Sequence, residues 1–234
     1  MVVNISVVFP AYNEEYTIEK MVLDALAVLK TLADDYEVII VDDCSSDRTR
    51  EIADNLVKKF HKVRVIHHKE NRGYGMALRS GFASASKDWI FYTDSDSQFN
   101  IKDLGLLVKK ADSADIITGY RFERSDPLFR AMLSRVYNWI ARNIFNLRVR
   151  DVNCGFKLIR RSVFDKVKLN HNSGIIWIEL MKKASMHNFR IREVKLHYFN
   201  RKFGRSRFFK VKTLLRSCRD LVILWVELVV LRKE

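Results

Sequence analysis

The 234-residue sequence is poor in the residues that mark small, stapled or unstructured proteins, with only two prolines, eight glycines and three cysteines. Cys44, Cys154 and Cys218 lie far apart, and this spacing disfavours both a disulfide framework and a zinc site. It is typical of proteins in a reducing compartment. A hydrophobic content of 48% with 12% aromatic residues excludes a disordered chain. We therefore expect one large domain, with or without an appendage.

Signals for export and for membrane insertion are also missing. The first ten residues carry no lysine or arginine ahead of the apolar run Ile5–Phe9, so no signal peptide is predicted. No stretch of 18 apolar residues occurs; Leu221–Leu231 is interrupted by Glu227 and is too short. We therefore expect no membrane-spanning helix.

The net charge of +14 comes from the second half of the chain. Residues 1–120 hold 15 Lys and Arg against 19 Asp and Glu, whereas residues 121–234 hold 27 against 9. Such asymmetry predicts an anionic partner for the second half. A nucleic acid, a membrane surface and a phosphorylated ligand all satisfy this requirement.

Short apolar segments alternate with helical patterns through the first 120 residues. The expected strands are residues 5–9, 37–41, 63–67, 89–93 and 116–118. Helical spacing of apolar residues predicts helices over residues 16–31, 76–84 and 101–111. A further helix is expected after Ser46 or Asp47, either of which can cap its N-terminus, and it is expected to end at about Phe60. This alternation is typical of a doubly wound α/β fold with a mostly parallel sheet.

Polar residues follow three of these strands at the points where the strands end. The three pairs are Tyr12 and Glu14, Asp42 and Asp43, and Asp94 and Asp96. Ligands of doubly wound sheets bind at the carboxyl ends of the strands, so we expect these pairs to line one crevice.

The segment Asp94–Gln98 predicts a metal site. If the strand before it stays extended, Asp94, Asp96 and Gln98 point the same way. Two neighbouring carboxylates favour a cation beside them, and oxygen ligands suit Mg²⁺ or Mn²⁺. The alternative interpretation is a polar turn that caps the strand.

Two segments of the second half are amphipathic. Residues 127–147 are expected to form a helix with aromatic residues on one side and arginines on the other, and Phe208–Leu231 begins amphipathic and becomes nearly all apolar. Such helices lie in a membrane interface or pack on the core with a solvated basic face. Between them we expect a turn, strand and turn over 148–163, a helix over 175–184 and a strand over 191–199.

Histidines and cysteines receive mostly structural interpretations. His61, His67 and His68 flank the strand 63–67 and are expected on the surface without a function, whereas His197 lies nearer to the basic segment Arg201–Arg207. Cys154 is expected to be a small packed residue rather than a nucleophile. The basic segment is centred on Gly204 and favours phosphate binding over a solvated loop.

Seven short motifs follow one another along the chain: Val8–Glu15, Val41–Thr49, Asn71–Gly73, Thr93–Gln98, Gly119–Arg121, Asp151–Lys157 and Arg201–Arg207. Together they resemble a family 2 glycosyltransferase of the GT-A fold, which implies a Rossmann-like, doubly wound mixed sheet. The last three motifs narrow the resemblance to polyprenyl-phosphate sugar transferases of the dolichyl-phosphate mannose synthase type. Each motif is weak alone, but their order and spacing agree over nearly the whole chain. Ser95 departs from the pattern, because a small apolar residue is frequent at that position.

The resemblance implies the transfer of one sugar from a nucleotide-sugar to a polyprenyl (dolichyl) phosphate, with inversion at the anomeric carbon. GDP-mannose is the preferred donor and a UDP-sugar is the alternative. The implied site residues are Pro10, Tyr12, Glu14, Asp42 and Asp94 for the nucleotide, Asp94, Asp96 and Gln98 for Mg²⁺ or Mn²⁺, Arg130 for the acceptor phosphate, and Asp96, Arg121, Arg201 and Arg207 for catalysis.

The resemblance also implies a domain organisation and a location. Residues 1–207 form the catalytic domain, with a nucleotide-sugar half (1–121) and an acceptor half (122–207), and residues 208–234 form a membrane-associating helix. Many relatives carry membrane spans after the catalytic domain, whereas this chain ends at Glu234. We therefore expect peripheral attachment at the cytoplasmic face of a membrane, through amphipathic helices or a small membrane subunit.

Three alternatives stay open at this point. A transferase that acts on a glycan hydroxyl needs a base, for which Asp151 is the candidate, whereas a phosphate acceptor is already an anion and needs none. A basic nucleic-acid-binding protein agrees with the charge, but no groove-reading motif is present, so no nucleic-acid partner is expected. A nucleotidyltransferase would require a pyrophosphorylase signature that the sequence lacks.

Overall fold

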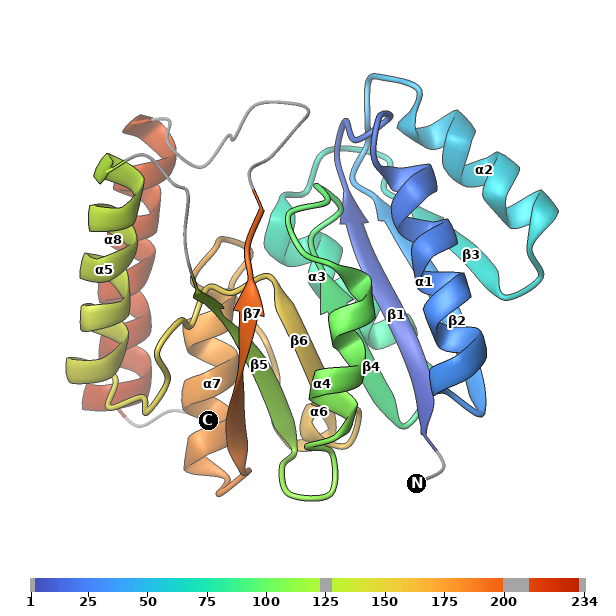
Figure 1. Cartoon of the computed structure of the whole chain (residues 1–234). Helices are drawn as coiled ribbons and strands as arrows, with labels where there is room; N and C mark the ends of the chain where they lie inside the picture. Colours follow the sequence, from blue (N-terminus) through green and yellow to red (C-terminus); the bar gives the residue numbers. More distant parts are fainter. Residues whose placement is uncertain (1–2, 123–127, 200–210, 232–234) are drawn as a thin grey trace.

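The computed structural model describes residues 3–122, 128–199 and 211–231, with residues 128–131 and 211–216 described by their backbone. Its centre is a seven-stranded sheet with the order β3-β2-β1-β4-β6-β5-β7 (Figure 1). The strands are β1 (Asn4–Ala11), β2 (Asp35–Asp42), β3 (Val63–His67), β4 (Trp89–Thr93), β5 (Ile116–Phe122), β6 (Phe156–Arg160) and β7 (Ile191–His197).

The sheet is mixed. Strands β3, β2, β1 and β4 pair in parallel, as the alternation of strands and helices predicts. The strand within residues 148–163 is β6, which lies between β4 and β5 and runs antiparallel to both. Strand β7 pairs in parallel with β5 at the edge opposite β3. This arrangement confirms the predicted doubly wound mixed sheet.

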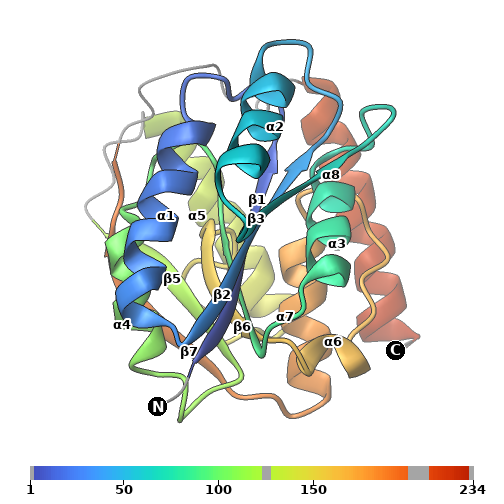
Figure 2. The ribbon, with the colours of Figure 1, turned by 90° about the vertical axis from the view of Figure 1, so that its right-hand side faces the viewer.

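Helices cover both faces of the sheet (Figure 2). The first face carries α1 (Ile18–Leu32), α2 (Thr49–Lys59), the 3₁₀ turn η1 (Ile101–Asp103) and α4 (Leu104–Val108). The second face carries α3 (Tyr74–Ser84), α5 (Leu128–Asn143), α6 (Val163–Lys166), α7 (Ile176–Met186), α8 (Val211–Trp225) and its π-helical continuation η2 (Val226–Val230).

The central strands are apolar on both faces because both faces are covered. In β1, Val7 and Phe9 belong to the core under α1, whereas Val8 belongs to the core under α3. Successive side chains of a strand point to opposite faces, so a continuous apolar run is required where helices lie on both sides.

Several element boundaries differ from the sequence predictions. Strand β5 extends to Phe122, beyond the predicted residue 118, because its second half pairs with Val194–His197 of β7. The predicted helix 101–111 is a 3₁₀ turn followed by one short helix that ends at Val108. Helix α5 ends at Asn143 rather than near 147, and the chain then turns through Asn146, which has a positive φ of 52°.

Candidate active site

The carboxyl ends of β1, β2 and β4 meet at one edge of the sheet. Ala11 is the register partner of Asp42, and the backbone N–H of Asp43 donates to the Ala11 carbonyl at 2.9 Å. The Ser95 hydroxyl donates to the Pro10 carbonyl, which joins the end of β4 to the end of β1. Three of the predicted groups are therefore brought together, and the unusual Ser95 takes part in that junction.

The loops after β1 and β2 are joined by hydrogen bonds. The backbone N–H of Asn13 donates to Ser45 Oγ at 3.0 Å, and its side-chain carbonyl accepts from the Ser46 N–H at 2.8 Å. The Glu14 N–H donates to Thr49 Oγ1 at 2.8 Å. The predicted nucleotide residues Tyr12 and Glu14 therefore lie on a loop whose backbone is held by residues 45–49.

Asp42 is fully buried beneath this pair of loops. Its Oδ1 accepts from the Ser45 N–H at 2.9 Å, and its Oδ2 lies 2.9 Å from His67 Nδ1. Burial opposes ionisation, but hydrogen bonds from Ser45 and His67 outweigh burial and lower the pKa of Asp42 below its ordinary value. In this conformation, the Asp42 carboxylate fixes the loop that begins at Asp43.

The prediction of surface positions for His67 and His68 is wrong. His67 is half-buried between Asp42 and Asp54, and His68 is buried with Nδ1 2.7 Å from Asp43 Oδ1 and Nε2 2.9 Å from Ser80 Oγ. Sequence reasoning missed them because the residues they contact belong to neighbouring strands and helices.

Asp43 organises the turn before α3. Its two carboxylate oxygens accept from the backbone N–H groups of Arg72 at 2.9 Å and Gly73 at 2.8 Å. Gly73 has a φ of 88°, a left-handed conformation that favours glycine. The motif Asn71–Gly73 is therefore a structural turn that places Tyr74 at the start of α3.

Asp94 lies in a polar cluster at the end of β4. Strand β4 ends at Thr93, so Asp94 and Asp96 do not continue an extended strand. The hydroxyl groups of Tyr92 and Tyr74 both donate to Asp94 Oδ1, and Trp177 Nε1 donates to the Tyr74 hydroxyl at 3.1 Å. Burial raises the pKa of Asp94 above its ordinary value, although the hydroxyl of Tyr92 opposes the rise.

Asp96 and Gln98 lie farther along the same turn. The Gln98 N–H donates to Asp96 Oδ1 at 3.2 Å. The Gln98 side-chain amide donates to the Phe199 carbonyl at 3.1 Å, and the Phe199 N–H donates back to the Gln98 carbonyl at 2.9 Å. The segment after β4 is therefore docked on the chain that leaves β7.

The donor set of this turn fits a metal ion that arrives with phosphate groups. Asp94, Asp96 and Gln98 offer hard oxygen atoms, which Mg²⁺ and Mn²⁺ prefer. Gly155 leaves space beside Asp94: a Cβ built there would overlap Asp94 Oδ2 and lie 2.8 Å from Cγ. Within the described ranges, three or more His, Cys, Asp or Glu side chains nowhere form a metal-binding group. The residues thus suit an ion whose remaining ligands are supplied by a diphosphate.

Arg121 of β5 and Asp151, which precedes β6, form a buried ion pair. Arg121 Nε lies 2.6 Å from Asp151 Oδ2, and Nη2 lies 2.8 Å from Oδ1. Asn138 donates to the same carboxylate at 3.4 Å, and the guanidinium carbon of Arg121 lies 5.3 Å from the centre of the Tyr198 ring. Asp151 therefore positions Arg121, and a carboxylate held in this way is poorly placed to act as a base.

The side chains of three predicted phosphate-binding arginines are not described in the structure. Arg201 and Arg207 lie outside the described residues, and Arg130 is described by its backbone in α5. Their proposed contacts with phosphate groups stay predictions.

Lys157 interacts electrostatically with Asp94 and Asp151 and is a candidate site residue that sequence reasoning missed. It is fully buried in β6, donates to the Cys154 carbonyl and lies 4.3 Å from the centre of the Trp177 ring. Burial lowers the pKa of Lys157 to about 8, and burial raises the pKa of Cys154 to about 12. The sequence signal that could have identified Lys157 is a lysine within the otherwise apolar segment Phe156–Ile159. Cys154 is a packed thiol, as predicted.

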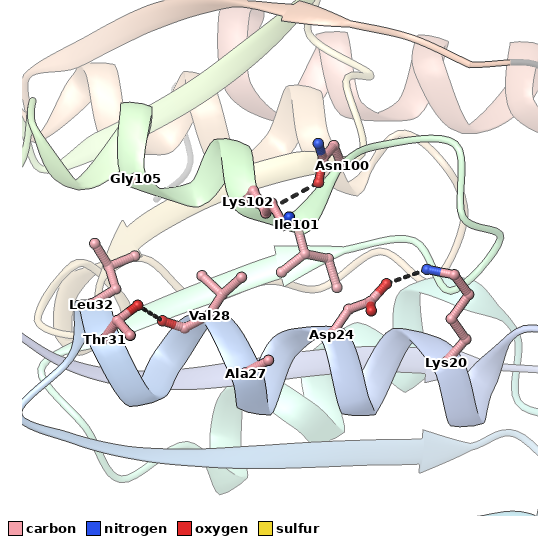
Figure 3. Close-up of a pocket in the computed structure, with 10 residues that line it drawn as sticks. All are labelled: Lys20, Asp24, Ala27, Val28, Thr31, Leu32, Asn100, Ile101, Lys102 and Gly105. Atoms are coloured by element: carbon pink, nitrogen blue, oxygen red, sulfur yellow. Dashed lines mark hydrogen bonds and ion pairs between the residues drawn. The ribbon is translucent and has the colours of Figure 1, made fainter.

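A groove of about 600 Å³ lies away from these residues, between α1 and the segment η1–α4 (Figure 3). Its wall includes the ion pair Lys20–Asp24 and the aliphatic side chains of Val28 and Ile101. It contains none of the predicted site residues.

Comparison with known proteins identifies the family. The family model described as "Glycosyl transferase family 2" matches residues 6–168, which include β2–β6, all but the first two residues of β1, and the residues that follow β1, β2 and β4. The chain belongs to glycosyl transferase family 2. Membership favours an enzyme over a nucleic-acid-binding protein, and it agrees with the resemblance of the sequence motifs.

Two curated relatives are similar over almost the whole chain. Glycosyltransferase AglD of Haloferax volcanii is 32% identical over 97% of this chain and 38% of its own length. The undecaprenyl-phosphate 4-deoxy-4-formamido-L-arabinose transferase of Salmonella paratyphi A is 29% identical over 93% of this chain and 66% of its own length. The chain therefore spans between about a third and two thirds of these relatives.

Solved structures confirm the GT-A fold. Glucosyl-3-phosphoglycerate synthase from Mycobacterium tuberculosis in complex with UDP has a TM-score of 0.72 and is 21% identical, over 96% of this chain and 79% of that protein. The same enzyme with Mn²⁺ and UDP-glucose has a TM-score of 0.70. At this level of identity the likeness shows the fold alone.

Proposed function

We propose that this member of family 2 transfers a sugar from a nucleotide-sugar to a polyprenyl phosphate with inversion at the anomeric carbon. The observation that carries the proposal is the docking of Gln98 on Phe199. It brings the candidate metal segment beside Phe199, which stands two residues before Arg201 in the sequence, and this supports a site in which a diphosphate and basic residues act together. The Salmonella relative, named for an undecaprenyl-phosphate acceptor, supports the choice of acceptor.

The preferred donor is GDP-mannose, and a UDP-sugar is the alternative. Solved relatives that hold UDP and Mn²⁺ support the second choice and a divalent metal ion. Pro10, Tyr12, Glu14 and Asp42 form the nucleotide side of the site in this proposal, with Asp42 acting through the loop after β2.

The chemistry is a single displacement. An oxygen of the acceptor phosphate attacks the anomeric carbon, and the bond between that carbon and the diphosphate oxygen breaks with its electron pair on the leaving group. Because the acceptor is already an anion, no residue has to remove a proton. Asp94, Asp96 and Gln98 would hold Mg²⁺ or Mn²⁺, which neutralises charge on the leaving diphosphate.

Arginine side chains bring the two anions together. The planar guanidinium group matches phosphate oxygens in a bidentate geometry. Arg121 is held by Asp151, and we assign it to the acceptor phosphate together with Arg130, Arg201 and Arg207, whose phosphate contacts are part of the proposal. The strongly basic second half of the chain is explained by this requirement.

A membrane surface is the proposed location of the acceptor. On α5, Met132, Val136 and Trp139 are 51–56% exposed and follow helical spacing. On α8 and η2, Val222, Val226 and Val230 form a second exposed row. We name these six residues the apolar face; both helices lie at the β7 end of the molecule (Figure 1).

Apolar rows beside basic residues suit a peripheral position at a lipid interface. None of the helices that the described residues form is both long and apolar enough to cross a membrane. We propose attachment at the cytoplasmic face, with a small membrane subunit as a further candidate partner.

A panel of nucleotide-sugars in thermal-shift measurements tests the donor side. Wild-type protein is expected to melt at a higher temperature with its donor and Mn²⁺ than with either alone. Asp96→Asn is expected to lose this joint shift, whereas Asp112→Asn, at an exposed position on the α4–β5 turn, keeps it. A full joint shift in Asp96→Asn would remove Asp96 from the metal site.

A further inference from the structure

The end of β3 carries a histidine held between two carboxylates. His67 is the register partner of Asp42, and its Nδ1 lies 2.9 Å from Asp42 Oδ2. Its Nε2 lies 3.0 Å from Asp54 Oδ1 on α2. The Asp42 side chain is fully covered, whereas the Asp54 side chain is 48% exposed.

The chemistry of these groups fixes the direction of one hydrogen bond. An ionised carboxylate only accepts hydrogen bonds, so a ring nitrogen that faces Asp42 must carry the proton. The Asp42 carboxylate is shielded from water, whereas the Asp54 carboxylate can be hydrated. We therefore assign the Nδ1 proton of His67 to the hydrogen bond with Asp42. A proton on Nε2 as well would let the ring link Asp54 of α2 to Asp42 of β2.

Asp42 passes this constraint to the loops of the nucleotide side. Its other oxygen accepts from the Ser45 N–H, and Ser45 Oγ accepts from the Asn13 N–H. Asn13 has a φ of 58°, an uncommon conformation for a residue other than glycine. A chain of three hydrogen bonds thus runs from His67 to the loop that carries Tyr12 and Glu14.

We propose that His67 is a positioning residue for the nucleotide-sugar, which fixes the Asp42 carboxylate and through it the loops of residues 12–14 and 43–49. The proposal rests on the proposed function, because it takes these loops to be the nucleotide side. His67 does not contact the reacting atoms. Its loss therefore weakens donor binding and leaves the chemical step intact.

Adjacent His68 has a different role in the same strand end. It contacts Asp43 and Ser80 and supports the turn before α3, which leads to Tyr74 and Asp94. His67 therefore holds Asp42 and the loop after β2, whereas His68 holds Asp43 and the turn before α3. His61 lies exposed in the turn before β3 and provides a neutral control.

The test compares wild type with His67→Gln, Asp54→Asn and His61→Gln. A glutamine at 67 presents a carbonyl oxygen to one of the two carboxylates, so one hydrogen bond becomes a repulsion. Calorimetric titration with UDP and with GDP gives the affinity for the nucleotide without any transfer. Steady-state kinetics then give kcat and the KM values for donor and polyprenyl phosphate.

We expect His67→Gln to weaken nucleotide binding and raise the donor KM about tenfold, with kcat and the acceptor KM within about twofold. Asp54→Asn should raise the donor KM only about threefold, because the Asp54 carboxylate is partly solvated and contributes less to holding the His67 ring. His61→Gln should match wild type. Nitrogen-15 NMR of wild type should show the His67 proton on Nδ1.

Unchanged nucleotide affinity in a folded His67→Gln protein would overturn the proposal, as would a wild-type ring with its proton on Nε2 alone. If His67→Gln fails to fold, the proposal is tested by two other measurements. A proton on Nδ1 of wild-type His67 and a raised donor KM in Asp54→Asn support it, and the absence of either overturns it. Nucleotide binding that depends on His67, without any transfer to a lipid phosphate, would overturn the proposed acceptor and leave this inference standing.

Discussion

Arg121 and Asp151 form a two-point ion pair, with N–O distances of 2.6 and 2.8 Å and less than an eighth of either side chain exposed. Removing one partner leaves the other charge buried without compensation. Because of this pairing, replacing either residue alone is expected to lower the free energy of unfolding more than the loss of one surface charge would.

We predict that Asp151→Asn and Arg121→Met each lower the free energy of unfolding by about 3 kcal/mol, and that the double variant loses less than their sum. Urea denaturation of the four proteins gives the coupling energy. The folded Asp151→Asn protein should retain measurable transfer to polyprenyl phosphate, because no base is needed and the amide oxygen that replaces a carboxylate oxygen still accepts a hydrogen bond from Arg121. Loss of all turnover in a folded Asp151→Asn protein, while Arg121→Met keeps turnover, would instead support the hydroxyl acceptor.

Gly155 is expected to be essential for the position of Asp94. A methyl group at 155 would overlap Asp94 Oδ2, so Gly155→Ala must displace the carboxylate or the strand end. We predict a rise of roughly tenfold or more in the Mn²⁺ concentration for half-maximal transfer. Gly105→Ala is the matched control, since its methyl group would meet only Leu32 Cδ1 at 4.0 Å. Identical Mn²⁺ curves for the two variants would contradict the assignment.

Glu37 stabilises the sheet at the edge away from the active site. Its Oε1 accepts from Ser6 Oγ at 2.6 Å and from the Ser86 N–H at 2.7 Å, and Oε2 accepts from Arg64 at 2.8 Å. Burial raises the pKa of Glu37, but these hydrogen bonds dominate and lower it to about 2 from an ordinary 4.5. The stabilisation is therefore complete above about pH 4.5 and is lost as the pH falls toward 2.

We predict that Glu37→Gln lowers the free energy of unfolding at pH 7 by about 2 kcal/mol, with a difference that shrinks between pH 4.5 and pH 2. Urea denaturation across this range measures it. Glu51→Gln, which removes an exposed partner of Arg48, should unfold like wild type. A Glu37→Gln difference that does not change with pH would contradict the attribution.

The apolar face of α5, α8 and η2 predicts binding to lipid. Trp139 and Val222 are 56% and 62% exposed, so replacing both by glutamate should leave the core intact and prevent insertion into the interface. We expect co-flotation with anionic vesicles to fall at least about fivefold, since each buried side chain contributes to binding. Leu106→Glu, at an exposed position on α4, should float as wild type does. Equal flotation of all three proteins would contradict this surface.

The positions of the strand ends can be predicted from the sequence, but the residues that contact those ends cannot. Apolar runs that stop at Asp42 and Asp94 predict correctly where polar residues meet, because parallel strands end at the same edge. His67 and His68 were misassigned because the register between β2 and β3 decides what they contact, and no local pattern encodes that register. The placement of β6 between β4 and β5, which buries Lys157 near Asp94, is likewise a long-range choice.

The most direct test of the central claim is identification of the transfer product. Wild-type protein, Mn²⁺, radiolabelled nucleotide-sugars and polyprenyl phosphate in vesicles are incubated, and the lipid is extracted. The account predicts label in the lipid phase as an acid-labile glycosyl phosphate, with one donor preferred and with loss of the product in Asp96→Asn. Label found only on a water-soluble hydroxyl acceptor, or a lipid phase without label for every donor, would contradict it.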